Sequence, residues 1–119
     1  MDKEHFEELV ARAVQNLPDE FQNRLENVDV VVDDNPTASQ LRKSGLSHGM
    51  TLLGLYEGVP LSQRQGMTRI FPDKITLFKG PLTRQADNLT DLKEQIKHTL
   101  WHEIAHYYGL DHRRIHDLE

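Results

Sequence analysis

The chain has 119 residues, of which 37% are hydrophobic and 28% charged, a composition typical of a soluble globular protein. We therefore expect a single domain over residues 1–119 and no membrane span. The 14 Lys and Arg against 19 Asp and Glu leave a formal net charge of -5, which disfavours a nucleic-acid partner. The sequence has no cysteine, which excludes disulfides and cysteine-based zinc sites, so nitrogen and oxygen atoms must bind any metal.

The N-terminus lacks the features of a secretory signal peptide. Its first residues, MDKEHFEELV, are acidic where a signal peptide is basic, and no apolar core follows within residues 1–30. We therefore expect the protein to be cytoplasmic.

The first part of the chain predicts two helices. Apolar residues from Phe6 to Leu17 recur at helical spacing, which predicts a helix over residues 3–17 that Pro18 ends. Pro18 and the two acidic residues after it suit the first turn of a short second helix that reaches Leu25, because proline lacks only a donor that is unsatisfied there anyway.

The middle of the chain predicts a small sheet. We expect four strands, of which the last two form a hairpin around the turn pair Pro72-Asp73: Val28–Val32, Thr51–Tyr56, Thr68–Phe71 and Lys74–Lys79. Residues 37–50 show no clear period and predict a loop with room for one helical turn. Gly80 and Pro81 end the last strand, and we expect the segment from there to Asn88 to be a connector.

A long helix follows the sheet. A capping signal at Thr90 or Asp91, with Glu94 three residues after the latter, predicts its start. Gly109 predicts its end after Tyr108, because glycine adopts the left-handed conformation that turns a chain out of a helix. The predicted fold class is therefore α+β, with the strands in the middle and the histidine-rich helix last.

Residues 102–112 read His-Glu-Ile-Ala-His-Tyr-Tyr-Gly-Leu-Asp-His and predict a catalytic zinc site. On a helix His102 and His106 lie one turn apart on the same side, so both imidazoles can bind one Zn²⁺. Glu103 can reach a water on that ion, which predicts the role of catalytic general base. The glycine after the helix lets the chain reverse, so that His112 supplies the third nitrogen. Three protein ligands leave a fourth position for water, as catalytic zinc requires.

Four neighbouring residues are ambiguous. His98 and His116 each lie one turn from a predicted ligand and could orient it or contact substrate, but surface histidines without such a role are more common. Tyr107 or Tyr108 could donate to a developing oxyanion, although a packing role is more common.

Three segments carry a resemblance to a known family: GLYEGVPL at Gly54–Leu61, PDKITLFKGPL at Pro72–Leu82 and HEIAHYYGLDH at His102–His112. With them, the chain resembles the small bacterial zincin-like metallopeptidases, which have a metzincin-type motif in a minimal domain. The resemblance implies a zincin fold: a small twisted mixed sheet, an active-site helix beneath it, and a cleft between them. It also implies that His102 and His106 are zinc ligands and that Glu103 is the catalytic acid and base.

Two features depart from the metzincin pattern. The seven residues after His112 contain no methionine, so the methionine turn that underlies the metal in metzincins is missing. In the small family the third ligand position often holds an acidic residue, so Asp111 competes with His112 for that role. The spacing of the long motif favours His112.

A second resemblance points to another class of enzyme. The spacing His-x3-His-x5-His, ending in Gly-Leu-Asp-His, is similar to the metal site of the bacterial endoribonucleases that mature ribosomal RNA. Those proteins carry glycine where this chain has Glu103, and a general base in that position favours peptide hydrolysis. A further alternative is a zinc-binding module without turnover, which the missing methionine turn favours.

The sequence therefore predicts a zinc-dependent metallopeptidase that acts on a peptide or protein substrate and has no nucleic-acid or membrane partner. We expect an extended substrate to add as a strand to the edge of the sheet. Our candidate for that edge is Thr68–Phe71, with Ser62–Gly66 as the rim of the cleft.

Overall fold

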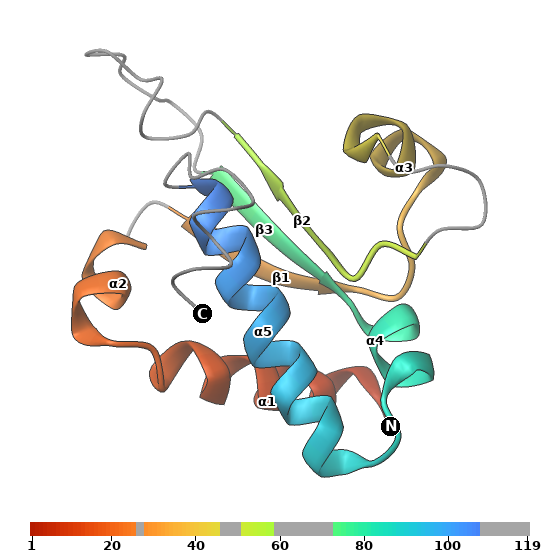
Figure 1. Cartoon of the computed structure of the whole chain (residues 1–119), viewed down its shortest axis with the longest axis horizontal. Helices are drawn as coiled ribbons and strands as arrows, with labels where there is room; N and C mark the ends of the chain where they lie inside the picture. The colour runs from red at the N-terminus through yellow and green to blue at the C-terminus, as the bar shows by residue number, and fades with distance from the viewer. Residues whose placement is uncertain (26–27, 46–50, 59–72, 108–119) are drawn as a thin grey trace.

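The computed structural model describes residues 1–25, 28–45, 51–58 and 73–107. Figure 1 shows the elements in this part of the chain: α1 (Lys3–Gln15), α2 (Asp19–Arg24), β1 (Val28–Asp33), α3 (Ala38–Ser44), β2 (Gly54–Glu57), β3 (Asp73–Phe78), α4 (Lys79–Gln85) and α5 (Leu89–Tyr107). The predicted α+β class is confirmed. Among these helices, none combines the length and the apolar character needed to cross a bilayer.

The three strands form one mixed sheet in the order β1-β3-β2. β1 runs parallel to β3, with Val28 opposite Asp73, whereas β2 runs antiparallel to β3, with Gly54 opposite Leu77. Every residue of the central strand β3 is buried except the half-buried Lys74. A parallel pair and an antiparallel pair in one sheet confirm the predicted small mixed sheet.

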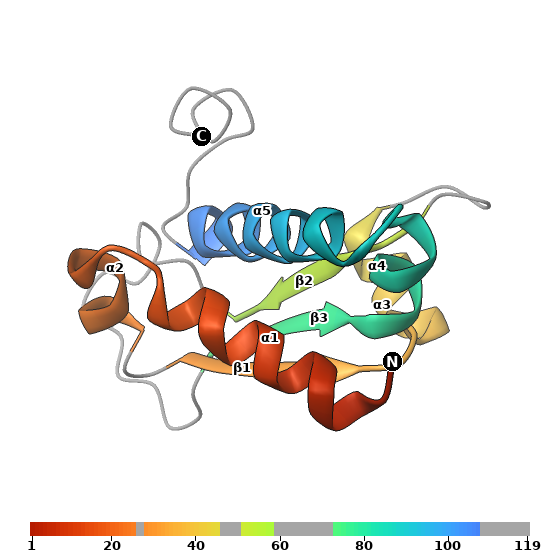
Figure 2. The same ribbon diagram turned by 90° about the horizontal axis from the view of Figure 1, so that it is seen from below.

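Helices α1 and α5 pack against each other and cover one face of this sheet. α5 contacts β2 and β3, α1 contacts β1, and Figure 2 shows α5 running along β2. The core between these elements is built from aliphatic and aromatic side chains that include Phe6, Leu9, Val10, Val32, Ile75, Leu77, Ile96, Leu100 and Ile104. Burial of this apolar surface fixes the position of α5 against the strands.

A glycine sets how closely α5 approaches the edge of the sheet. A Cβ atom at Gly54 would lie 2.7 Å from Cγ2 of Thr99 and 3.3 Å from Cγ of Glu103, both on α5. The first of these separations is too short for real carbon atoms, so only glycine fits there without a shift. The missing side chain therefore allows β2 to lie beside the part of α5 that carries Glu103.

Two helices replace segments that we predicted to be irregular. α3 lies in the predicted loop over residues 37–50 and has a capping box, because Thr37 Oγ1 accepts the Gln40 N–H at 3.1 Å and Gln40 Oε1 accepts the Thr37 N–H at 2.9 Å. α4 replaces the predicted connector after Gly80. Its proline, Pro81, lies in the first turn, where a helix tolerates the missing N–H.

Several predicted boundaries also shift. The first helix ends at Gln15 rather than residue 17, and the second strand is Gly54–Glu57 rather than Thr51–Tyr56. Helix α5 begins one residue before Thr90, because Oδ1 of Asn88 accepts the Asp91 N–H at 2.8 Å and caps the first turn in place of the predicted residues.

The predicted hairpin is only partly described. Asp73 was assigned to its turn, but it is the first residue of β3 and pairs with Val28. The other arm, Thr68–Phe71, and the proposed cleft rim, Ser62–Gly66, lie outside the described residues. The edge and rim therefore stay predictions.

Replacement of Gly54 by alanine tests the close approach of β2 and α5. We expect Gly54→Ala to lower the free energy of unfolding by about 1–3 kcal/mol, the range typical of overpacking. Thr99→Ser removes the methyl group nearest to the new Cβ, so the double variant should recover part of that loss. Urea unfolding of the four proteins measures both effects, and equal stability of Gly54→Ala and the wild type would contradict the packing described.

Candidate metal centre

Helix α5 has a buried face and a histidine face. The buried face packs on the sheet and the other helices, and its residues include Leu92, Ile96, Thr99, Leu100, Glu103, Ile104 and Tyr107. His98, His102 and His106 follow one another at four-residue spacing, which places them along one neighbouring side of the helix. His102 and His106 are half-buried, whereas His98 is exposed.

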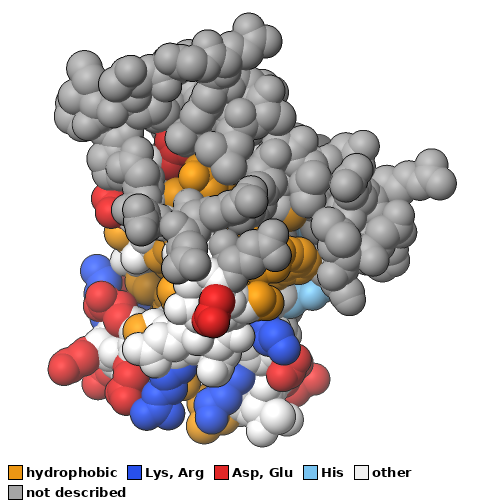
Figure 3. Space-filling view, turned by 90° about the vertical axis from the view of Figure 1, so that its left-hand side faces the viewer, with side chains coloured by type: hydrophobic (Ala, Val, Ile, Leu, Met, Phe, Trp, Pro, Cys, Tyr) orange, Lys and Arg blue, Asp and Glu red, His pale blue; other side chains and the backbone are white. Residues whose placement is uncertain are grey.

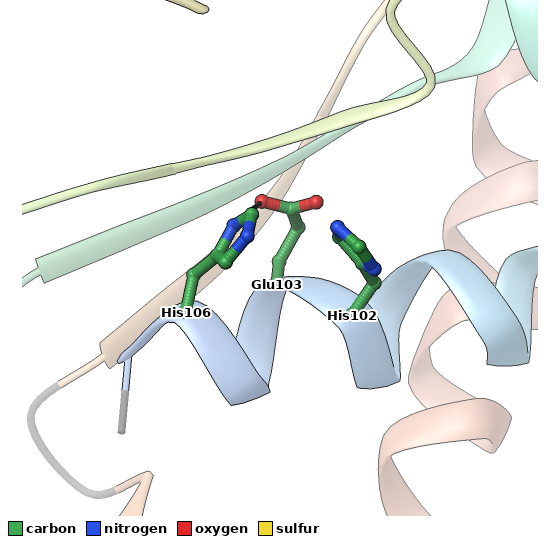
Figure 4. A group of neighbouring side chains, drawn as sticks. All are labelled: His102, Glu103 and His106. Atoms are coloured by element: carbon green, nitrogen blue, oxygen red, sulfur yellow. Dashed lines mark hydrogen bonds and ion pairs between the residues drawn. The ribbon is translucent and has the colours of Figure 1, made fainter. Parts of the chain in front are cut away.

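The structure brings His102, Glu103 and His106 together. One potential ligand atom from each residue lies within 4.8 Å of the others, and the two imidazole centroids are 4.7 Å apart with their planes at 74°. Figure 4 shows the three side chains on the side of α5 that faces the strands. Two imidazoles and a carboxylate are ligands that Zn²⁺ accepts, so these residues could hold a metal ion.

Glu103 connects the helix to the edge of the sheet. Its side chain is only 7% exposed, and its Oε1 atom accepts the backbone N–H of Tyr56 in β2 at 3.0 Å. The same oxygen lies 3.2 Å from Nδ1 of His106. The carboxylate is therefore held between a strand and a candidate metal ligand.

The contact with Glu103 changes the acid–base behaviour of His106. The hydrogen bond to Glu103 raises the pKa of His106 above its ordinary value of 6.5, the charge of Glu103 raises it further, and burial opposes both effects. A metal binds the neutral imidazole, so a metal ion at this site must compete with the proton on His106.

The sequence analysis missed the surroundings of Glu103. Asp73 is fully buried, and its Oδ2 atom accepts the hydroxyl hydrogen of Tyr56 at 2.6 Å. The tyrosine ring meets the ring of Tyr107 edge to face, with centroids 5.8 Å apart, so Tyr107 has the packing role. One signal was present in the sequence, because Asp73 shares the alternation of the inward-facing residues Ile75 and Leu77.

Other predicted site residues lie outside the described part of the chain. They are Tyr108, Gly109, Asp111, His112 and His116. The third ligand, whether His112 or Asp111, therefore stays a prediction. His98 lines a hollow together with Leu53 and Thr99 and is not part of the three-residue group.

The mixed sheet, the long helix beside its edge and the His-Glu-His group define a zincin-like module. The family model of the zincin-like metallopeptidases matches residues 25–119, and the chain belongs to this family. No protein among those with a curated description matches the chain.

A solved structure shares the fold. It is described as a conserved hypothetical protein from the bacterium named in its title as Thermo thermophilus, and it is 25% identical to this chain. The similarity covers 91% of this chain and 94% of that one, with a TM-score of 0.58. The relationship therefore extends well beyond the histidine motif.

Single substitutions test which histidines bind metal. We expect about one zinc per chain in the wild type, and loss of stoichiometric zinc in His102→Ala and in His106→Ala. His98→Ala is the matched control, because His98 lies one turn earlier on the same side of α5, and it should keep its zinc. Metal analysis after dialysis measures the content, and full zinc in either ligand variant would contradict the assignment.

The raised pKa of His106 predicts a pH dependence for the metal-free protein. Because the folded pKa lies above the unfolded value of 6.5, protonated His106 contributes stability that is fully present below that value and is lost as the pH rises through the folded pKa. The difference in Tm between the metal-free wild type and His106→Ala should therefore be larger at about pH 6 than at about pH 8.5. Thermal unfolding in chelator measures it, and a constant or reversed difference would contradict this linkage.

Proposed function

We propose that the protein is a zinc-dependent peptidase. The observation that carries the proposal is the carboxylate of Glu103 beside two half-buried imidazoles at zinc-ligand spacing, on a helix that lies along a sheet edge. The family to which the chain belongs supports the same reaction class. We propose His102, His106 and His112 as the metal ligands.

The chemistry divides between the metal and the chain's own residues. Bound zinc would supply a Lewis acid that polarises the scissile carbonyl and acidifies the attacking water. Glu103 accepts the proton of that water as a general base and then passes it to the leaving amine as a general acid. The low exposure of Glu103 limits competing contact with bulk water and strengthens its interaction with charge that develops nearby.

We propose that an extended peptide lies along the sheet edge next to α5. Of the described strands, β2 lies at this edge, and its Tyr56 already contacts Glu103. A peptide that adds to a strand edge aligns its carbonyl groups through main-chain hydrogen bonds and so accepts many sequences. The predicted edge Thr68–Phe71 remains a candidate for the outer side of the same groove.

The ribonuclease alternative has less support. Tracking a phosphate backbone needs a continuous positive surface. On the face drawn in Figure 3, the Lys and Arg side chains of the described residues are interspersed with Asp and Glu. The net charge of -5 and the carboxylate of Glu103 also favour peptide hydrolysis over cleavage of RNA.

A peptide-library digest compares the wild type with Glu103→Gln to test the proposed function. The amide keeps the shape of the side chain but cannot accept the proton, so we expect kcat to fall by about 10²–10⁴ while zinc is retained. His98→Ala serves as the control and should cleave like the wild type.

Three outcomes would contradict the peptidase. Zinc-loaded wild type that leaves casein and the library uncut would support the binding module without turnover. Cleavage of single-stranded RNA with peptides untouched would select the nuclease. Equal turnover by Glu103→Gln and the wild type would remove Glu103 from the reaction.

A further inference from the structure

We infer that Tyr56 and Asp73 form a positioning pair that fixes the orientation of the Glu103 carboxylate, and this inference rests on the peptidase function proposed above. Neither residue belongs to the three-residue metal group. They act through the backbone N–H of Tyr56 and through the end of β2 that carries it. The pair links the buried core of the sheet to the proposed general base.

The first link is the hydrogen bond from the Tyr56 N–H to Oε1 of Glu103, at 3.0 Å. A hydrogen bond to a charged acceptor is stronger than one between neutral groups, so it holds the carboxylate against rotation. Figure 4 shows one carboxylate oxygen beside His106 and the other on the side of His102. Because the strand and His106 both engage Oε1, Oε2 is the oxygen that takes the proton.

The second link holds Tyr56 itself. Its hydroxyl donates to Oδ2 of Asp73 at 2.6 Å, and its ring packs edge to face against Tyr107 on α5. Tyr56 lies opposite Ile75 in the sheet, two residues along β3 from Asp73, so the two side chains are diagonal neighbours on one face. The residue whose N–H contacts Glu103 is thus fixed at its far end.

The burial of Asp73 is the evidence that this contact has a purpose. Asp73 is 0% exposed and shares its face of β3 with Ile75 and Leu77, where a hydrophobic side chain would avoid the cost of burying a carboxylate. Gly58, just after β2, has φ +155°, and a Cβ atom there would collide with the side chain of Asp73. The chain after β2 therefore packs directly over this carboxylate.

A fixed carboxylate matters because a general base must point at the proton it removes. We expect Tyr56→Phe to lower kcat about tenfold with KM within about twofold of the wild type. The zinc affinity, measured by chelator competition, should also stay within about twofold, because both histidines keep their own support on α5. Asp73→Asn should behave nearly like the wild type, because the amide oxygen still accepts the tyrosine hydroxyl.

The amide signal of Tyr56 in metal-free, ¹⁵N-labelled protein tests the pair without any turnover. In the wild type this amide should exchange slowly with solvent, and Tyr56→Phe should speed its exchange about tenfold. Asp73→Leu should do the same, while Asp73→Asn should restore slow exchange. Thr83→Val is the matched control: it removes a hydroxyl bonded to the Lys79 carbonyl on α4 and should leave the signal of residue 56 unchanged.

The outcomes separate this inference from the proposed function. Unchanged exchange and unchanged kcat in Tyr56→Phe would overturn the positioning pair even if the protein cleaves peptides. If the wild type cleaves no peptide, the proposed function fails, and the exchange rates of Tyr56→Phe and Asp73→Asn still decide whether the pair holds Glu103. Loss of slow exchange in Thr83→Val would show a general loosening of the fold and would also overturn the inference.

Discussion

The hydrogen bond between Glu103 and the backbone of Tyr56 joins the two parts of the molecule that make the candidate site. It ties α5, which carries the histidines, to β2, which lies at the described edge of the sheet. The bond needs a close approach of the two elements, and Gly54 permits that approach because it has no side chain to meet Thr99. The apolar core behind α5 then keeps the helix in this position.

The same contact shapes the chemistry of the metal group. A buried carboxylate beside His106 raises the pKa of that imidazole, so the metal-free site favours a proton where the metal-loaded site needs a free nitrogen lone pair. A cation at the site would replace the proton and relieve Glu103 of one partner. The carboxylate is then free to exchange protons with a substrate, which is the behaviour that a peptidase of this family needs.

Much of this structure was predictable from local sequence patterns. The two long helices show sustained apolar periodicity, and α5 lies where the histidine motif predicted it. The short helices α3 and α4 were missed, because a capping box and a proline in a first turn are weak signals beside the surrounding polar residues. The support of Glu103 by Tyr56 and Asp73 depends on strand register, which pairs residues far apart in the chain and cannot be deduced from either segment alone. The third ligand is still predicted from spacing only.

The central claim is that zinc is bound by the imidazoles of His102 and His106. X-ray absorption spectroscopy of the zinc-loaded protein tests it most directly. We expect a first shell of nitrogen and oxygen atoms at about 2.0–2.1 Å, with the outer-shell scattering of at least two imidazoles. That imidazole scattering should fall in His102→Ala if any zinc remains bound. A shell of oxygen atoms without imidazole scattering would contradict the claim.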